Sequence, residues 1–232
     1  GFRDKWDILH STCVRVGVLS ALRSAMLDGQ VIGVMITASH NAEVDNGIKI
    51  VDADGGMLTQ TWEPLADALM NISNVEEAVK YINDIMTIFP SHGTGRVILG
   101  RDTRPHSEEL CNCVKQGISA LHGTTYDAGV VTTPQLHFLV HHTNAQQLAH
   151  PISMSLYYST LASGFRSLLC LANSSPQHII IDASFGVGSI ALMELLPVLH
   201  AEGVEFSMDI RNVAGQGPVN YGCGAEHVQK GR

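Results

Sequence analysis

The sequence predicts an α/β fold: a mixed, mostly parallel sheet sandwiched by helices, followed by a second, incomplete α/β domain of similar type. Two observations carry this prediction. Short β-branched runs such as Val31–Thr37 alternate with longer amphipathic stretches along the 232-residue chain, which is the order typical of β-α-β units. The same run lacks the apolar–polar alternation of a half-exposed strand, which indicates that helices cover both of its faces.

The first domain is predicted element by element along the chain. An amphipathic helix over about Asp7 to Leu27 precedes the strand that ends at Thr37. A turn at Asp54-Gly55-Gly56 predicts a hairpin between Ile48–Val51 and Met57–Leu58. The remaining elements are helical stretches over Pro64–Ile88 broken near Asn71–Asn74, a strand Arg96–Leu99, a helix Ser107–Leu121, a strand Tyr126–Val131 and a helix opening at Thr132-Thr133-Pro134.

A boundary near Ala149 to Ser153 divides the chain into domains 1–152 and 153–232. The second domain opens with a helix over Ser155–Leu171 and continues with a strand over His178–Ile181. Gly186-x-Gly188-x-x-Ala191 then follows that strand and opens another helix, which is the context of a dinucleotide-binding turn. Asp209 lies about 20 residues further along, at the spacing of a ribose-binding acid. Dinucleotide binding therefore stays open as an alternative.

The most informative segment follows the first strand. Ala38-Ser39-His40-Asn41 comes directly after it, and Asn46-Gly47-Ile48-Lys49 follows within ten residues. This order puts a serine hydroxyl on a tight loop at the carboxyl end of a buried strand, where open α/β sheets bind ligands. Lys49 offers a mobile cation that a phosphate there would need. A polar loop without chemistry is the alternative interpretation of the same residues.

The segments TASHN and DNGIK resemble the active-site serine loop of the α-D-phosphohexomutase superfamily. Gly1-Phe2-Arg3, GVMITASHNAEVDNGIKIVD, GRDTRP and VVTTPQLH are similar to the eukaryotic-type branch of that superfamily, which acts on N-acetylglucosamine phosphates. The resemblance runs through nearly the whole chain and is weakest between about Thr143 and Gln177.

The resemblance implies a phosphosugar mutase that interconverts N-acetylglucosamine 6-phosphate and 1-phosphate, a step in UDP-N-acetylglucosamine synthesis. In this family a phosphoserine gives its phosphate to the sugar, and the bisphosphorylated sugar reorients and returns the other phosphate. Carried over to this chain, Ser39 is the phosphate carrier and binds Mg²⁺ through its phosphate. The resemblance puts Lys49 and His40 beside the transferring group, and Arg3 and Arg101 in the same cleft.

Arg101, Asp102 and Arg104 follow a second strand-like run and are expected at its carboxyl end. Phosphoryl transfer asks a protein mainly for positioning and charge stabilisation, which Lys, Arg and a metal supply. Two arginines around one aspartate could equally form a structural ion-pair network. Both interpretations stay open.

Two features depart from the family pattern. Position 42 is Ala where the family loop usually has Pro, a change worth only about 0.4–1 kcal/mol of unfolded-state entropy. The chain also stops at Arg232, before the family's aspartate-rich magnesium loop and its sugar- and phosphate-binding domains. We therefore expect the segment to be inactive alone, because phosphate monoesters can require up to ~10²¹-fold acceleration and a few cations cannot supply it.

Composition excludes some partners. The formal net charge of −8 argues against nucleic acid and anionic membranes, and no apolar run approaches the ~18 residues of a membrane-spanning helix. Five scattered cysteines, an odd number, are typical of reduced thiols in a cytoplasmic protein. A sugar phosphate is the expected ligand, while the sequence does not predict the oligomeric state.

Three alternatives remain beside the N-acetylglucosamine assignment. A related phosphoglucomutase or phosphomannomutase would share the serine loop, because the residues that discriminate between the sugars lie beyond Arg232. A non-catalytic chain that binds a partner would expose apolar surface on the second domain. A dinucleotide-binding module would use the glycine turn at Gly186.

Overall fold

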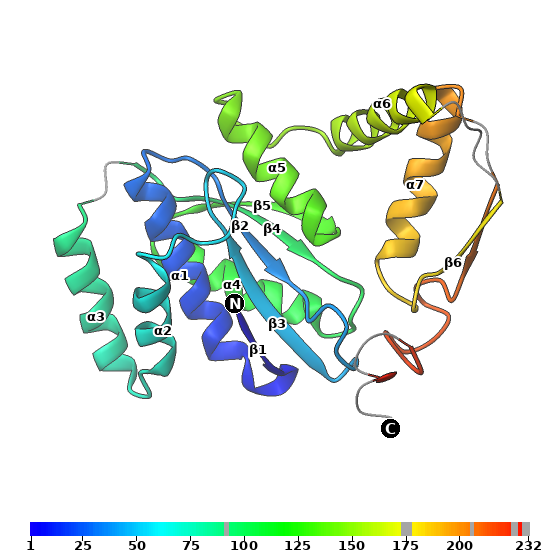
Figure 1. The fold of residues 1–232 in the computed structure, drawn as a ribbon. Helices are drawn as coiled ribbons and strands as arrows, with labels where there is room; N and C mark the ends of the chain where they lie inside the picture. Colours follow the sequence, from blue (N-terminus) through cyan, green and yellow to red (C-terminus); the bar gives the residue numbers. More distant parts are fainter. Residues whose placement is uncertain (91–92, 173–177, 205–206, 224–226, 229–232) are drawn as a thin grey trace.

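The computed structural model describes residues 1–90, 93–172, 178–204, 207–223 and 227–228. Its main sheet has five strands, in the order β1 (Phe2–Lys5), β3 (Asp45–Val51), β2 (Ile32–Ile36), β4 (Arg96–Arg101) and β5 (Thr124–Val130). A second sheet pairs β6 (Ile179–Asp182) with β7 (Met208–Arg211). Figure 1 shows helices on both faces of the main sheet and the second sheet to one side of it.

The pairing of the strands is mixed. β2 is parallel to β4 and β4 to β5, whereas β3 is antiparallel to both β2 and β1. β6 and β7 are parallel to each other. Parallel neighbours need long crossover connections, and the helices between these strands supply them. The predicted α/β class is confirmed.

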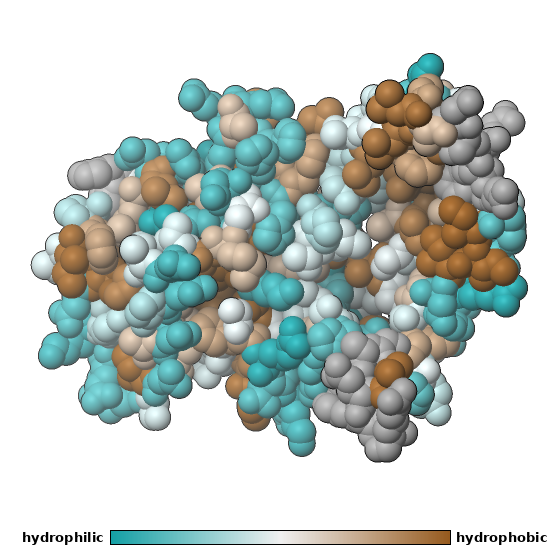
Figure 2. All heavy atoms as spheres, in the orientation of Figure 1, coloured by the Kyte–Doolittle hydropathy of each residue, from teal (hydrophilic) through white to brown (hydrophobic). Residues whose placement is uncertain are grey.

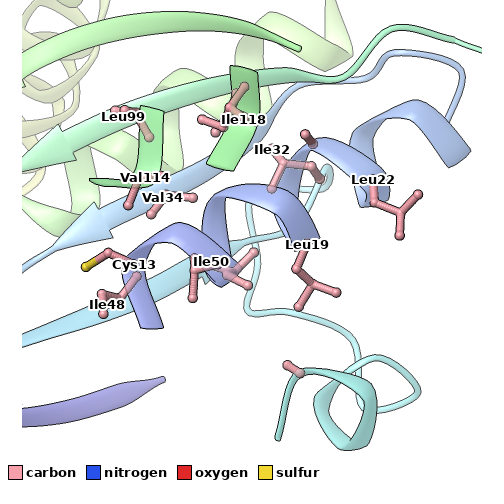
Figure 3. Packing of buried hydrophobic residues seen from close by; sticks show 14 of the residues in the cluster. Cys13, Leu19, Leu22, Ile32, Val34, Ile48, Ile50, Leu99, Val114 and Ile118 are labelled. Atoms are coloured by element: carbon pink, nitrogen blue, oxygen red, sulfur yellow. The ribbon is translucent and has the colours of Figure 1, made fainter. Parts of the chain in front are cut away.

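Two apolar cores lie on opposite faces of the main sheet. On one face, α1 (His10–Met26) and α4 (Ser107–Ala120) pack against β2, β3 and β4, together with α2 (Glu63–Asn71) and α3 (Val75–Ile88). Figure 3 shows Leu19 of α1 and Val114 of α4 among the strand residues Val34 and Ile50. On the other face α5 (Thr133–Ala145) covers the sheet. β2 is therefore buried on both sides, which explains its uninterrupted apolar sequence.

Local signals define several helix ends. Thr132 and Gln135 form a capping box, each side chain bonding the other residue's backbone N–H, and begin α5 where the sequence predicts it. Asn74 accepts a hydrogen bond of 2.7 Å from the Glu76 N–H and caps α3. This cap explains the break between α2 and α3, which the sequence also predicts.

The strands at the sheet edge differ from the prediction. Phe2–Lys5 forms β1, for which no strand is predicted, and β3 begins at Asp45 rather than Ile48. The predicted turn closes through a hydrogen bond from Asp52 N to Gly56 O, but only a single bridge joins Val51 to Met57. The second strand of the predicted hairpin is therefore wrong, because β3 pairs instead with β1 and β2. The first helix also begins later, at His10, after a short 3-10 turn at Trp6–Ile8.

In the part after residue 152, several large apolar side chains are exposed to solvent. α6 (Met154–Ala172), β6 and α7 (Gly188–Ala201) follow the predicted order, whereas no strand is predicted where β7 lies. The exposed apolar side chains include Leu168 at 64%, Leu171 at 84% and Ile180 at 57% exposure, and Figure 2 shows hydrophobic atoms gathered over α6, α7 and β6. The predicted boundary lies in the connection between α5 and α6.

Two further observations concern the whole described chain. The five cysteines carry free thiols. Among the helices in the described ranges, none combines the length and the apolar character needed to cross a lipid bilayer.

Candidate active site

Ser39 stands on the loop directly after β2. Its backbone has φ +55°, in the left-handed region that L side chains rarely adopt, and the residue is exposed whereas Ala38 before it is buried. The Ser39 N–H donates to Thr37 Oγ1 at 3.2 Å. The hydroxyl-bearing residue is thus turned out of the sheet at the carboxyl end of a buried strand, as the sequence predicts.

The loop borders a cleft of about 440 Å³. The cleft walls come from the carboxyl ends of β2 and β4, from β3, from the start of α5, and from the turn between β6 and α7. The lining residues are Met35, Thr37, Ser39, Lys49, Asp102, Thr103, Arg104, Thr132, Thr133, Pro134, Gly186, Val187, Gly188, Val219 and Asn220. The cleft is therefore built from both parts of the chain.

A buried ion pair lies beneath the loop. Ile36 of β2 is in register with Arg101 of β4, which brings Thr37 beside Asp102, and the Thr37 hydroxyl donates to Asp102 Oδ2 at 2.7 Å. The Ser107 hydroxyl donates to Asp102 Oδ1 at 2.7 Å, and Arg104 donates to the same carboxylate from Nη1 and from its backbone N–H. This carboxylate is saturated with donors. Asp102 and Arg104 thus form a buried ion pair, which is one half of the two-arginine network that the sequence left open.

Arg104 reaches from this pair to the serine loop. Its Nη2 donates to Ser39 O at 3.3 Å and to Asn41 O at 2.8 Å. A cation that is 3% exposed and bonded in this way holds the backbone of the loop. Arg104 thereby fixes the position of the Ser39 peptide group.

Lys49, His40 and Arg3 lie around the loop in different ways. Lys49 of β3 pairs with Met35 of β2, and both side chains line the cleft beside Ser39. His40 is exposed next to Ser39. Arg3 of β1 is exposed, and its Nη1 donates to Asn41 Oδ1 at 2.9 Å. Lys49 is thus the predicted cation that shares the cleft with the serine.

Arg101 points to a different partner. Its Nη1 lies 3.0 Å from Asp127 Oδ1 on β5, and Lys115 Nζ lies 2.8 Å from the other oxygen of the same carboxylate. Burial acts to raise the pKa of Asp127, but hydrogen bonds from Lys115 and Gly129 and the two positive charges lower it overall. Arg101 is not among the residues that line the cleft, so the structure does not bring it to Ser39.

The donor set does not fit a magnesium ion by itself. Within the ranges that the structure describes, no three His, Cys, Asp or Glu side chains gather so that they could hold a metal. Asp102, the carboxylate in the cleft wall, already accepts from Thr37, Arg104 and Ser107. A Mg²⁺ ion on a phosphate at Ser39 would therefore find no further cluster of protein ligands among the described residues.

The glycine turn faces the serine loop. Gly186 and Gly188 line the same cleft as Ser39, and Ser184 and Phe185 before them have φ +52° and +57°. Asp209 lies within β7, where Arg211 donates to it at 2.9 Å. The turn thus forms a wall of the serine cleft, and its acidic partner is engaged, so this geometry does not favour the dinucleotide alternative.

Sequence reasoning missed Asn220. This residue follows β7 and donates through Nδ2 to Ser39 O at 2.7 Å and Asn41 O at 2.8 Å. It lies 181 positions from Ser39, so no local pattern connects the two. Neither the spacing of residues nor their periodicity in the sequence indicates such a contact.

Comparison with a known family covers the first part of the chain. The family described as "Phosphoglucomutase/phosphomannomutase, alpha/beta/alpha domain I" matches residues 14–73 and 65–150. These ranges include the serine loop, Lys49 and the Asp102–Arg104 pair. The match therefore covers more than half of the chain.

Curated relatives match along nearly the whole chain. Phosphoacetylglucosamine mutase of Arabidopsis thaliana is 40% identical, over 99% of this chain and 42% of that protein. The phosphoacetylglucosamine mutases of Oryza sativa subsp. japonica and Homo sapiens are 38% and 35% identical, each with the same two coverages. The chain spans less than half of the length of these relatives.

Solved structures agree with the fold. The N-acetylglucosamine-phosphate mutase of the α-D-phosphohexomutase superfamily, in its substrate complex, has a TM-score of 0.88 and 34% identity, over 100% of this chain and 44% of that one. The Aspergillus fumigatus N-acetylphosphoglucosamine mutase in complex with GlcNAc-6P and magnesium has a TM-score of 0.87 and 33% identity, with the same coverages.

Proposed function

We propose that this chain, which belongs to the phosphoglucomutase/phosphomannomutase domain I family, carries a phosphoryl group on Ser39 and exchanges it with a sugar phosphate. The observation that carries the proposal is the exposed, left-handed Ser39 at the wall of a cleft that Lys49 also lines. A serine turned out of a buried strand is accessible to a ligand, and a nearby ammonium favours a phosphate.

The proposed substrates are N-acetylglucosamine 6-phosphate and 1-phosphate, interconverted on the route to UDP-N-acetylglucosamine in the cytoplasm. Support comes from relatives named phosphoacetylglucosamine mutase, which match over 99% of this chain. A glucose or mannose phosphate is the alternative within the same family. The intermediate would be the sugar that carries both phosphates.

In the proposed transfer, a sugar hydroxyl oxygen forms a bond to the phosphorus on Ser39, and the bond from phosphorus to Ser39 Oγ breaks. The sugar hydroxyl gives up its proton, and Ser39 Oγ gains one. Lys49 would neutralise the charge on the phosphoryl oxygens, since positioning and electrostatic stabilisation dominate this chemistry. His40 and Arg3 would lie at the entrance, and a role for Arg101 would require release from Asp127.

The family resemblance, and not the described residues, is the reason to expect magnesium at this site. When bound, the ion would neutralise charge on the phosphate of Ser39. Because the described donor set does not complete its coordination, we propose that residues 1–232 alone accept a phosphoryl group in a single slow transfer but do not turn over the two sugar phosphates. Product formation by the purified 1–232 chain in the presence of Mg²⁺ would show this part of the proposal to be wrong.

The carrier role is tested by intact mass. After incubation with the hexose 1,6-bisphosphate, we expect the chain to gain the mass of one phosphate, and Ser39→Ala to gain none. Ser155→Ala, which removes an exposed serine of α6, is the matched control and should gain phosphate like the unaltered chain. A gain that persists in Ser39→Ala, or no gain in any of the three, would refute the carrier assignment.

A second candidate function is partner binding without catalysis. The exposed apolar side chains of α6 and β6, Leu168, Leu171 and Ile180, favour it, because contiguous apolar surface marks interaction sites. Light scattering at several concentrations distinguishes the two functions when combined with the mass experiment. Association without phosphate uptake would favour partner binding over phosphate transfer.

A further inference from the structure

We propose that Asn220 is a positioning residue for the Ser39 loop, acting from a segment that follows β7. Its importance for phosphate transfer rests on the function proposed above, whereas its effect on the loop does not. The Asn220 amide donates to Ser39 O at 2.7 Å and to Asn41 O at 2.8 Å. One side chain therefore bridges the carbonyl of the nucleophile and that of the residue two positions later.

The same two carbonyls also accept from Arg104 Nη2, at 3.3 Å and 2.8 Å. A carbonyl oxygen has two lone pairs, so each carbonyl has the number of donors that it can accept. Arg104 comes from the first part of the chain, below the loop, and Asn220 from the last part. The loop is thus held between two donors that belong to different parts of the fold.

The segment around Asn220 is itself anchored on both sides of the cleft. The Val219 N–H donates to Glu43 Oε2 at 2.9 Å, within the serine loop. The Asn220 N–H donates to Ser184 O at 2.9 Å, in the turn between β6 and α7. Val219 is 7% exposed and lines the cleft with Asn220. The segment therefore ties the serine loop to the glycine turn opposite.

The position of Asn220 also suits its residue type. Its φ of +63° lies in the left-handed region, which asparagine and glycine adopt at the least steric penalty. Ser39 has a similar φ of +55°, and such a conformation persists only when the surrounding structure holds it in place. The hydrogen bonds from Asn220 and Arg104 to the carbonyl of Ser39 hold it in this way.

The proposal is tested by two substitutions at position 220. Asn220→Gly keeps access to the left-handed conformation and removes the amide, and Asn220→Asp keeps the shape but replaces donors by a carboxylate that cannot donate. We expect the hydrogen-bonded amides of Ser39, Asn41 and Asp45 to exchange hydrogen about tenfold faster in both variants, which is the effect of one or two lost hydrogen bonds. Amides of β2 serve as the internal reference and should be unaffected.

Tyr221→Ala is the matched control. Tyr221 is the neighbouring residue, 74% exposed, and its truncation leaves the amide of Asn220 in place. We expect loop exchange to equal that of the unaltered chain. Unchanged loop exchange in both position-220 variants, or an equal rise in the loop and in β2, would overturn the proposal, since the latter indicates a general loss of structure.

Phosphate uptake from the hexose 1,6-bisphosphate gives a second readout. We expect the maximal rate of uptake to fall about tenfold in Asn220→Gly and Asn220→Asp, with the half-saturating bisphosphate concentration unchanged, because the Asn220 amide is bonded to the carbonyls of the serine loop. Equal rates in the variants and the unaltered chain would overturn the positioning role. No uptake by the unaltered chain, together with the expected exchange, would instead refute the proposed function and leave the loop contact established.

Discussion

Asp102 lies among buried hydrogen-bond donors near the serine. It accepts hydrogen bonds from the side chains of Thr37, Arg104 and Ser107, and Arg104 in turn holds the loop. Because Arg104 is 3% exposed, removal of its counter-charge would leave an unpaired buried cation. The geometry of the candidate site thus depends on the ion pair of Asp102 and Arg104.

We expect Asp102→Ala to lower the free energy of unfolding by about 3–5 kcal/mol, the typical effect of breaking a buried ion pair from one side. Urea unfolding followed by circular dichroism measures it. Asp127→Ala, which breaks the more exposed pairs with Arg101 and Lys115, is the control and should change stability by only about 0–1 kcal/mol. Equal losses in the two variants would contradict the importance given to the buried network.

His106 makes stability depend on pH. The ring is buried and stacks on Trp6 with ring centroids 5.1 Å apart. Burial lowers its pKa below the usual 6.5, and Arg104 adds to the effect. As pH falls below 6.5 the unfolded chain therefore gains the proton first, and stability is lost until the pKa of the folded state is reached.

As pH falls below 6.5, we expect His106→Gln to lose less unfolding free energy than the unaltered chain. Urea titration at several pH values measures this loss. His10 gives the opposite sign, because a hydrogen bond with Glu109 raises its pKa above 6.5. Its contribution is present at acid pH and disappears as pH rises through the raised pKa. If the unfolding free energy of His106→Gln fell with pH as steeply as that of the unaltered chain, the pH dependence assigned to His106 would be wrong.

At the scale of the helices and strands, two glycines allow α1 and α4 to cross at close range. A methyl group at Gly17 would collide with Val114 O, and one at Gly117 with Val14 O. The two helices approach closely at this point, which brings Val16 and Val114 into the same core. The spacing of apolar residues predicts both helices but not their separation.

We expect Gly17→Ala to destabilise the protein by about 1–3 kcal/mol, the usual effect of overpacking, even though Ala favours a helix over Gly. Gly164→Ala on α6 is the matched control, because its added methyl group would have no neighbour within 4 Å. That variant should be neutral or more stable, by up to about 1 kcal/mol. Thermal unfolding of both variants decides between close packing and helix propensity.

Local and non-local elements differ in how well the sequence predicts them. The start of α5 and the break before α3 depend on Thr132, Gln135 and Asn74, whose side chains bond backbone groups two or three residues away. β1 depends instead on pairing with β3, for example Arg3 opposite Gly47. A four-residue edge strand has no periodicity of its own, so the sequence cannot reveal it.

At the scale of the molecule, the cleft draws residues from both predicted domains, and we propose that residues 1–152 fold without the rest. The two cores of the five-stranded sheet lie almost entirely within that range. A chain that ends at Ile152 should keep slow exchange in β2 and β4, while its serine loop exchanges faster because Asn220 is missing. Fast hydrogen exchange of all β2 amides in this shortened chain would show that residues 1–152 do not fold alone.

The sequence by itself determined the α/β order, the serine at a strand end and the family resemblance, because these depend on residues close together in the chain. The resemblance also implied that Lys49 lies near that serine. Only the tertiary structure decided that Arg101 turns to Asp127, that Arg104 holds the loop, and that Asn220 does so from 181 positions away. The physical reason is that a hydrogen bond acts over about 3 Å in space, whatever the separation along the chain.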